Sequence, residues 1–433
     1  MSIEQSIIDT LRAEVIPAMG CTEPVAVALA VSKARELSGL STNALDEVET
    51  IEVSVSPNIF KNGLSVGIPG TKEVGLIMAI ALGYCACYSR DGLEVFESVH
   101  EKELERAKIL IESNKIILKM EDTSDKIFIH AKITTKDGFS RAIIKDRHDQ
   151  FILMEDQHGV VFEQTIEKVS TPKENPLYSE PIMKLIETVE KMPHDPLVFL
   201  LDGLEMNQHI ANYGLMNKCG MGVGYTLNEQ ADKGLLGKDL MNRAMAMTAA
   251  ASDARMSGVS LPVMSSNGSG NNGLTALLPI VAYAEKNNIS DEKLAKAAAM
   301  SHLINGTIKN AIGRLSAICG CGVAAGTGAS VGIAWLMGAS SSQIEGVIQN
   351  MIANTAGMVC DGAKEGCSLK LATSASAAVQ SAILAVNDVI VIPGSGIVGR
   401  GADETIKNLG ILSNEALMNV DQVIIKIMNS YTN

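Results

Sequence analysis

The chain has 433 residues, which is long for one compact core, so we expect at least two domains. Its 36 basic and 49 acidic residues give a formal net charge of −13, and such a surface repels a phosphate backbone and argues against a nucleic-acid partner. Aromatic residues make up only 3% of the chain, so its cores must be built from small and aliphatic side chains.

The first 170 residues mix helical and strand patterns. Helices are predicted over residues 6–15, 25–37 and 74–86, and strands over residues 49–56, 127–135 and 160–165. The segment 171–176 contains two prolines and charged residues, and is the expected linker.

Beyond that linker the pattern is almost wholly helical, with windows rich in Ala and Met such as 240–251 and 291–303. The sequence therefore predicts the α+β class. A mixed α+β domain is expected over residues 1–172, and an all-helical domain over residues 173–433.

Two apolar stretches, at 322–339 and 371–386, are dense in small residues and marginal or short for a bilayer span, so buried helices are expected there. The N-terminus shows no apolar signal-peptide segment. We expect a cytoplasmic protein with no membrane partner, in which the eight cysteines serve as ligands or nucleophiles rather than in disulfides.

Four of the cysteines form two local groups in the helical part, Cys319 with Cys321 and Cys360 with Cys367. Glycines adjoin the thiols, which lets the backbone wrap closely around an inorganic centre. The spacing matches neither a zinc ribbon nor a ferredoxin motif, so it leaves open an iron–sulfur cluster, a zinc ion, or simple burial of small apolar side chains.

A loop of serines, asparagines and glycines at residues 264–273 precedes an apolar helix that is expected from Leu274. Hydroxyls, amides and free N–H groups before a helix form an anion pocket that suits the carboxylate of a small substrate. An ordinary polar loop with a helix cap is the alternative.

The turn at residues 20–24 places a thiol, Cys21, two residues before a carboxylate, Glu23, at a helix start. Such a pair suits acid–base chemistry or metal binding, although a capping turn with an incidental cysteine fits equally well. Lys61 and Asn62 add a cation and an amide in a turn after a strand.

The remaining candidates are more simply explained by packing. His302 lies in an apolar helical stretch and fits a core histidine, and Cys85 and Cys87 lie in an Ala-rich helix. Cys219 has no partner nearby in the sequence.

Taken in chain order, the motifs together resemble the L-cysteine desulfidase family, relatives of the bacterial iron–sulfur L-serine dehydratases. The resemblance spans nearly the whole chain. It rests on the segments at 20–24, 56–58, 61–63, 251–256, 265–273, 314–317 and 360–362.

The resemblance implies an oxygen-sensitive lyase with a [4Fe-4S] cluster that converts L-cysteine to pyruvate, ammonia and hydrogen sulfide. It places the cluster ligands on Cys319, Cys360 and Cys367, with Cys321 as the alternative to Cys319. It also assigns the Cys21 turn a thiol-handling role, and Cys21 could itself be a ligand.

In the implied mechanism, an open iron binds the leaving group as a Lewis acid while a base removes the Cα proton. Cys21 and Glu23 are the first candidates for the base, and Lys61 and His302 are further ones. The substrate would be held by side chains of the loop and of the turn after the strand, namely Ser266, Asn267, Ser269, Asn271, Lys61 and Asn62.

Two other functions stay open, an L-serine dehydratase that uses the same cluster and a zinc-stabilised binding protein without turnover. The expected partners are a small amino-acid substrate and a second copy of the chain in a homodimer.

Overall fold

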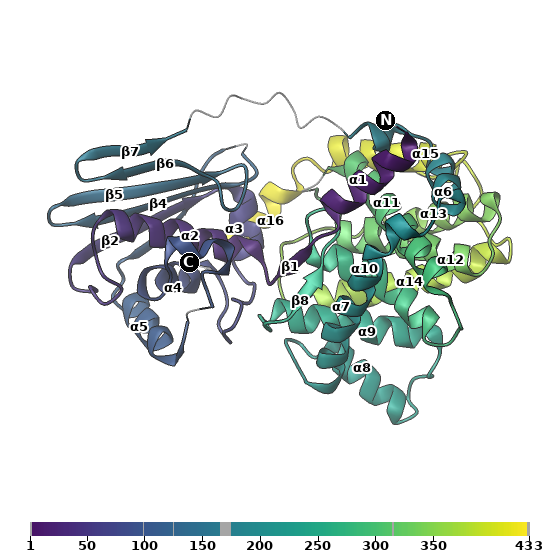
Figure 1. The fold of residues 1–433 in the computed structure, drawn as a ribbon, viewed down its shortest axis with the longest axis horizontal. Coiled ribbons are helices and arrows are strands. Elements are labelled where there is room, and N and C mark those ends of the chain that lie inside the picture. The colour runs from purple at the N-terminus through teal and green to yellow at the C-terminus, as the bar shows by residue number, and fades with distance from the viewer. Residues whose placement is uncertain (1, 98, 124, 165–174, 314–315, 431–433) are drawn as a thin grey trace.

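The computed structural model describes residues 2–97, 99–123, 125–164, 175–313 and 316–430. It consists of two lobes, one built on a β-sheet and the other almost wholly helical (Figure 1). The expected α+β class, with the sheet in the N-terminal part, is confirmed. The boundary expected between residues 172 and 173, and most of the linker expected at 171–176, lie outside the described residues.

The sheet lobe contains one six-stranded sheet in the order β3-β2-β4-β5-β6-β7, in which only the β2–β3 pair is parallel. Helices lie against one face of this sheet (Figure 1). The strands are β2 (Val48–Val55), β3 (Ile116–Met120), β4 (Phe128–Thr135), β5 (Gly138–Lys145), β6 (Phe151–Asp156) and β7 (Gly159–Glu163), and the helices are α2 (Thr22–Leu37), α4 (Leu76–Cys85) and α5 (Glu101–Glu112).

The three expected strands correspond to β2, β4 and β7, while β3, β5 and β6 were not predicted. The uncovered face of the sheet is charged, with ion pairs such as Lys119–Glu52 and Arg141–Glu155. Strands with one solvated face carry apolar residues at only every second position, which gives a weaker sequence signal than a continuous apolar run.

The helical lobe packs ten helices and the N-terminal helix α1 (Ile3–Glu14) around one apolar core. Ile7, Leu11 and Val15 belong to that core, so the chain's first helix packs with the helical lobe and not with the sheet. The ten helices are α6 (Ile182–Lys191), α7 (Phe199–Met216), α8 (Val223–Asp232), α9 (Leu240–Met256), α10 (Gly270–Ala284), α11 (Asp291–Ile312), α12 (Gly326–Leu336), α13 (Ser341–Thr355), α14 (Cys367–Val386) and α15 (Ala402–Ile411).

The two apolar stretches noted in the sequence form α12 and α14. Among the described helices, α14 alone has the length and hydropathy of a membrane span, and 56% of its apolar window is buried inside the protein. Burial against neighbouring helices agrees with the expected core helix.

Two segments connect the lobes near the middle of the molecule (Figure 1). A short strand, β1 (Pro17–Met19), pairs antiparallel with β8 (Pro262–Met264), and leads directly into the turn at 20–24. Near the other end of the chain, α16 (Val420–Asn429) returns to the sheet lobe, where Asp421 accepts a hydrogen bond from Lys61 Nζ at 2.7 Å. Lys61 lies on α3 (Pro57–Gly63).

Close helix packing in the helical lobe depends on small residues. A Cβ atom added at Gly214 of α7 would lie 2.2 Å from the carbonyl oxygen of Ala250 on α9. We therefore expect Gly214→Ala to lower the free energy of unfolding by about 1–3 kcal/mol, because backbone atoms cannot rotate away from the new methyl group.

Urea unfolding followed by circular dichroism measures this change. Gly357→Ala is the matched control, since an added Cβ there meets nothing within 4 Å, and it should be neutral or slightly stabilising. Equal stability of the two variants would contradict the packing described here.

Candidate active site at the junction of the lobes

The two cysteine groups predicted from the sequence lie side by side in the structure. Cys319 precedes a π-helical turn, η4 (Gly320–Ala325), and Cys360 lies in the loop before α14. The two loops are joined by backbone hydrogen bonds, from Cys319 N–H to Met358 O (2.8 Å) and from Cys360 N–H to Ala317 O (2.7 Å). The first two residues of the motif at 314–317 lie outside the described residues.

The four thiols are close enough to shift one another's pKa values. The Cys319 thiol donates to Cys321, which raises the pKa of Cys319 well above its ordinary value and lowers that of Cys321. Burial raises the pKa of Cys360, and raises that of Cys367 to about 11. Cys319 is buried and the other three are half-buried. The directions of these shifts make Cys321 the most acidic of the four thiols.

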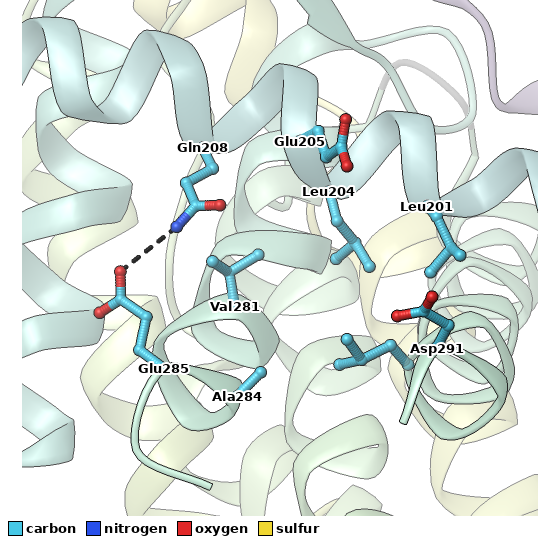
Figure 2. A pocket seen from close by; sticks show the side chains of 9 residues that line it. Leu201, Leu204, Glu205, Gln208, Val281, Ala284, Glu285 and Asp291 are labelled. Carbon is cyan, nitrogen blue, oxygen red and sulfur yellow. Dashed lines mark hydrogen bonds between the residues drawn. The ribbon is translucent and has the colours of Figure 1, made fainter. Parts of the chain in front are cut away.

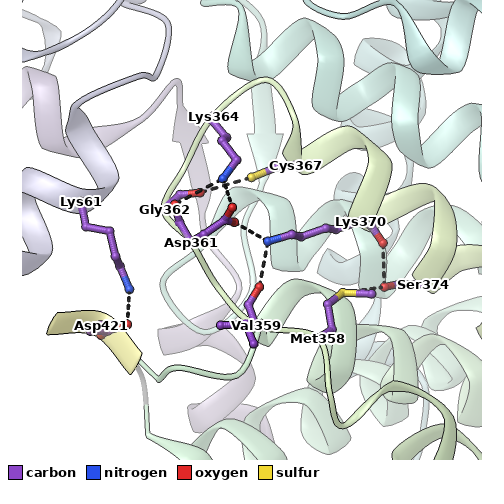
Figure 3. Close-up of polar contacts among 10 residues, drawn as sticks. All are labelled: Lys61, Met358, Val359, Asp361, Gly362, Lys364, Cys367, Lys370, Ser374 and Asp421. Carbon is purple, nitrogen blue, oxygen red and sulfur yellow. Dashed lines mark hydrogen bonds and ion pairs between the residues drawn. The ribbon is translucent and has the colours of Figure 1, made fainter. Parts of the chain in front are cut away.

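Lysine side chains surround these thiols. Lys370 donates to Val359 O at 2.8 Å and pairs with Asp361 (Figure 3). The ammonium groups of Lys370 and Lys61 both act to lower the pKa of Cys360, against the larger effect of burial. Lys309 acts in the same direction on Cys321. These cations would offset the negative charge of several thiolates gathered in one place.

Gly362 brings the cysteine loop against the sheet lobe. Its φ of +94° is a left-handed conformation, and an added Cβ would lie 2.3 Å from the carbonyl oxygen of Lys61. Only glycine allows this approach. Lys61 therefore contacts both the cysteine loop and, through its ammonium group, Asp421 of α16 (Figure 3). Asn62 is half-buried on the same short helix.

The Cys21 turn reaches the same region from the start of α2. Cys21 lies in a small apolar cluster with Val66 and Met256, against which Cys367 also packs. Its Sγ donates to Glu23 Oε2 at 2.9 Å. Burial and the Glu23 carboxylate raise the pKa of Cys21 well above its ordinary value, so Cys21 is a neutral thiol that donates a hydrogen bond to Glu23.

Two of the four loop side chains that were predicted to bind substrate form hydrogen bonds to other protein side chains instead. They are Ser266 and Asn267. Ser266 Oγ accepts from the Nδ2 atoms of Asn267 (3.1 Å) and Asn305 (2.9 Å), and lies 2.8 Å from His302 Nδ1. Asn267 Oδ1 accepts from Tyr178 Oη at 3.2 Å. Because Ser266 already accepts two hydrogen bonds, its own proton goes to His302 Nδ1.

The tautomer of His302 follows from that hydrogen bond, and its proton lies on Nε2, an atom without a partner among the described residues. Burial lowers the pKa of His302 to about 3, so the ring is neutral. His302 is fully buried, as expected of a core histidine.

Of the other two predicted loop residues, Asn271 is bonded within the protein and Ser269 lies beside a site thiol. Asn271 Oδ1 accepts from Arg255 at 3.1 Å, and its Nδ2 is directed at Met256 Sδ. Ser269 caps α10, accepting from the backbone N–H of Asn272, and its Oγ lies 3.8 Å from Cys321 Sγ. Ser269 is the predicted substrate ligand that directly contacts a site thiol in the described structure.

Several residues of the site were not predicted: Asn272, Arg255, Lys309 and Lys370. Lys309 lies seven positions after His302 on α11, with Asn305 between them, and this spacing puts all three on one helix face. Polar residues at helical spacing inside an apolar helix were the signal that could have revealed this face.

The donor set fits an iron–sulfur cluster better than one metal ion. Within the described ranges, no three His, Cys, Asp or Glu side chains converge on a point where an ion could sit, whereas tetrahedral zinc needs ligands about 2.0–2.3 Å from one centre. In a four-iron cluster each thiolate binds its own iron, so the ligands surround a larger body. The four neighbouring thiols would supply the soft ligands of such a cluster, and the lysines beside them would offset its negative charge.

The three other cysteines and one surface hollow contribute no residue to the group of four thiols. Cys85 and Cys87 are buried in the core of the sheet lobe, as expected, and Cys219 is half-buried beside Asp253. A hollow of about 300 Å³ between α7, α10 and α11 is lined by apolar and acidic side chains, and none of the site residues contributes to it (Figure 2).

Comparison with known proteins agrees with this picture. The family model of the serine dehydratase alpha chain matches residues 90–426. A protein of Alkaliphilus metalliredigens is 53% identical over 430 residues, covering 99% of this chain and 96% of the relative. A protein of Clostridioides difficile is 48% identical over 428 residues, covering 98% and 99%. Both are named only as UPF0597 proteins, a name that states no activity.

These matches confirm the expected relationship to the serine dehydratases, and with it the expected class of lyase. The chain belongs to the serine dehydratase alpha-chain family.

Proposed function

We propose that this lyase is an iron–sulfur-dependent L-cysteine desulfidase, which releases pyruvate, ammonia and hydrogen sulfide. The observation that carries the proposal is the meeting of the Cys21–Glu23 pair with the four-cysteine site at the junction of the lobes. A neutral thiol hydrogen-bonded to a carboxylate can exchange protons with a sulfur substrate and its leaving group.

The cluster would be held by Cys319, Cys360 and Cys367, with Cys321 as the alternative to Cys319. When bound, it supplies an open iron that acts as a Lewis acid toward the departing sulfur. Lys61, Lys309 and Lys370 offset the charge of the thiolates.

The protein's own groups supply the proton transfers. A base removes the Cα proton of L-cysteine, and the electron pair of that bond forms the double bond as the carbon–sulfur bond breaks toward sulfur. The 2-aminoacrylate released takes up one water to give pyruvate and ammonia. We assign the role of base to Glu23 and the role of donor to the departing sulfide to Cys21. The hydrogen bond from Cys21 Sγ to Glu23 Oε2, at 2.9 Å, supports this assignment, because it lets a proton pass between the two groups.

L-Serine dehydratase is the second candidate, since the family model carries that name. It would use the same elimination with water as the leaving group. The two candidates therefore differ in the leaving group and not in the architecture of the site.

The substrate assignment is tested by anaerobic turnover of L-cysteine and L-serine. We expect kcat/KM for L-cysteine, measured as pyruvate and sulfide release, to exceed that for L-serine at least about tenfold, the equivalent of 1.4 kcal/mol in transition-state binding. Turnover of L-serine alone would overturn the assignment, and a colourless protein holding zinc without iron would overturn the cluster.

The ligand assignment is tested with Cys360→Ser. We expect this variant to lose iron, acid-labile sulfide and activity, because serine is a poor ligand for a cluster that thiolates hold. Cys219→Ser is the control and should keep all three. Iron analysis of Cys319→Ser and Cys321→Ser then shows which of the two is the ligand; retention of the cluster in the Cys319 variant alone would move the assignment to Cys321.

The acid–base assignment is tested with Glu23→Gln, which keeps the size of the side chain and removes its basicity. We expect kcat to fall about 10²–10⁴-fold while the iron content stays constant. Glu112→Gln, an exposed position on α5, is the control and should have no effect. Unchanged kcat in the Glu23 variant would transfer the role of base to another group.

A further inference from the structure

Asn272 has a buried side-chain amide at the start of α10. The residue lies in the first turn of α10 and is 1% exposed. Neither Oδ1 nor Nδ2 has a hydrogen-bond partner among the residues that the structure describes. Burying an amide without partners is costly, because the hydrogen bonds to water are lost and nothing replaces them. The cost is recovered if a ligand supplies the partners.

The free amide faces the cysteine turn. A Cβ atom added at Gly320, between Cys319 and Cys321, would lie 3.6 Å from Asn272 Oδ1 and 3.7 Å from its Nδ2. The same point is 3.6 Å from Lys309 Cε. The absence of a side chain at Gly320 therefore leaves a space the size of a methyl group, which the amide and the lysine both border.

The N-terminus of α10 borders this space as well. The helix has 15 residues, and its cap Ser269 lies 3.8 Å from Cys321 Sγ. The positive end of its dipole and the Lys309 ammonium group both favour a negatively charged group here. The space is therefore suited to a carboxylate. The Asn272 amide beside it offers both a hydrogen-bond donor and an acceptor, so it can also bind a second group of the same ligand.

We propose that Asn272 recognises the α-amino-acid group of the substrate, donating from Nδ2 to the α-carboxylate and accepting at Oδ1 from the α-ammonium. A primary amide offers a donor and an acceptor side by side, and an α-amino acid presents the complementary pair on one carbon. Asn271 cannot do this, because Arg255 and Met256 occupy its amide. The inference rests on the proposed function, since it assumes that the substrate binds beside the cysteines.

The role is tested by calorimetric binding of L-alanine, which has no leaving group, and of propionate, which lacks the ammonium group. Anaerobically purified wild-type protein should bind L-alanine at least tenfold more tightly than propionate. Asn272→Leu has a similar volume and no polar atoms. We expect it to bind L-alanine no more tightly than propionate, with unchanged iron content and a Tm equal to or above that of the wild type.

Two further variants keep the test decisive. Thr248→Val removes another buried polar atom without a partner, on α9, and should leave L-alanine binding unchanged. Asn272→Asp keeps the acceptor and loses the donor, so it should weaken propionate binding more than L-alanine binding, and it replaces the leucine variant if that variant does not fold.

Wild-type affinity for L-alanine in Asn272→Leu would overturn the inference, as would a wild type that does not distinguish L-alanine from propionate. Loss of iron in Asn272→Leu with unchanged L-alanine binding would assign the amide to the cluster instead. The proposed reaction fails separately, if wild-type protein binds L-alanine as expected but releases no sulfide from L-cysteine.

Discussion

The buried guanidinium group of Arg255 is the interaction on which the site depends most. It donates to the carbonyl oxygen of Gly20 at 2.6 Å and to Asn271 Oδ1 at 3.1 Å, and its side chain is 8% exposed. One side chain from α9 thereby fixes both the turn that carries Cys21 and the start of α10. Hydrogen bonds from a charged donor are strong in a buried environment, and losing one of these acceptors would leave a buried N–H group without a partner.

Three lysines gather around the cysteine loops of a chain that is acidic overall. The chain carries a formal charge of −13, yet the cysteine loops are bordered by Lys61, Lys309 and Lys370. Thiols that burial would keep protonated can thus be converted to thiolates once iron binds, since metal binding displaces their protons. Lys309 also favours an anionic group at the start of α10.

Much of the fold and part of the site could be predicted from the sequence. Hydrophobic periodicity in the sequence predicted the helical lobe and three of the strands. Glycines next to cysteines predicted the two cysteine groups. The loop at 264–273 was recognised as a unit, yet sequence alone could not show that Ser266 and Asn271 turn inward while Asn272 stays unpartnered. Adjacent residues of a helix start point in different directions, and tertiary contacts decide which of them meets a ligand.

The placement of α1 makes the sheet lobe an insertion within the helical lobe. Helix α1 packs in the helical core, the chain leaves that core after β1, builds the six-stranded sheet, and returns after β7. During synthesis from the N-terminus, α1 and β1 must wait for partners that emerge more than 150 residues later, whereas the sheet can form as a unit. Assembly of the site is therefore a late event, completed when Asp421 near the end of the chain reaches Lys61.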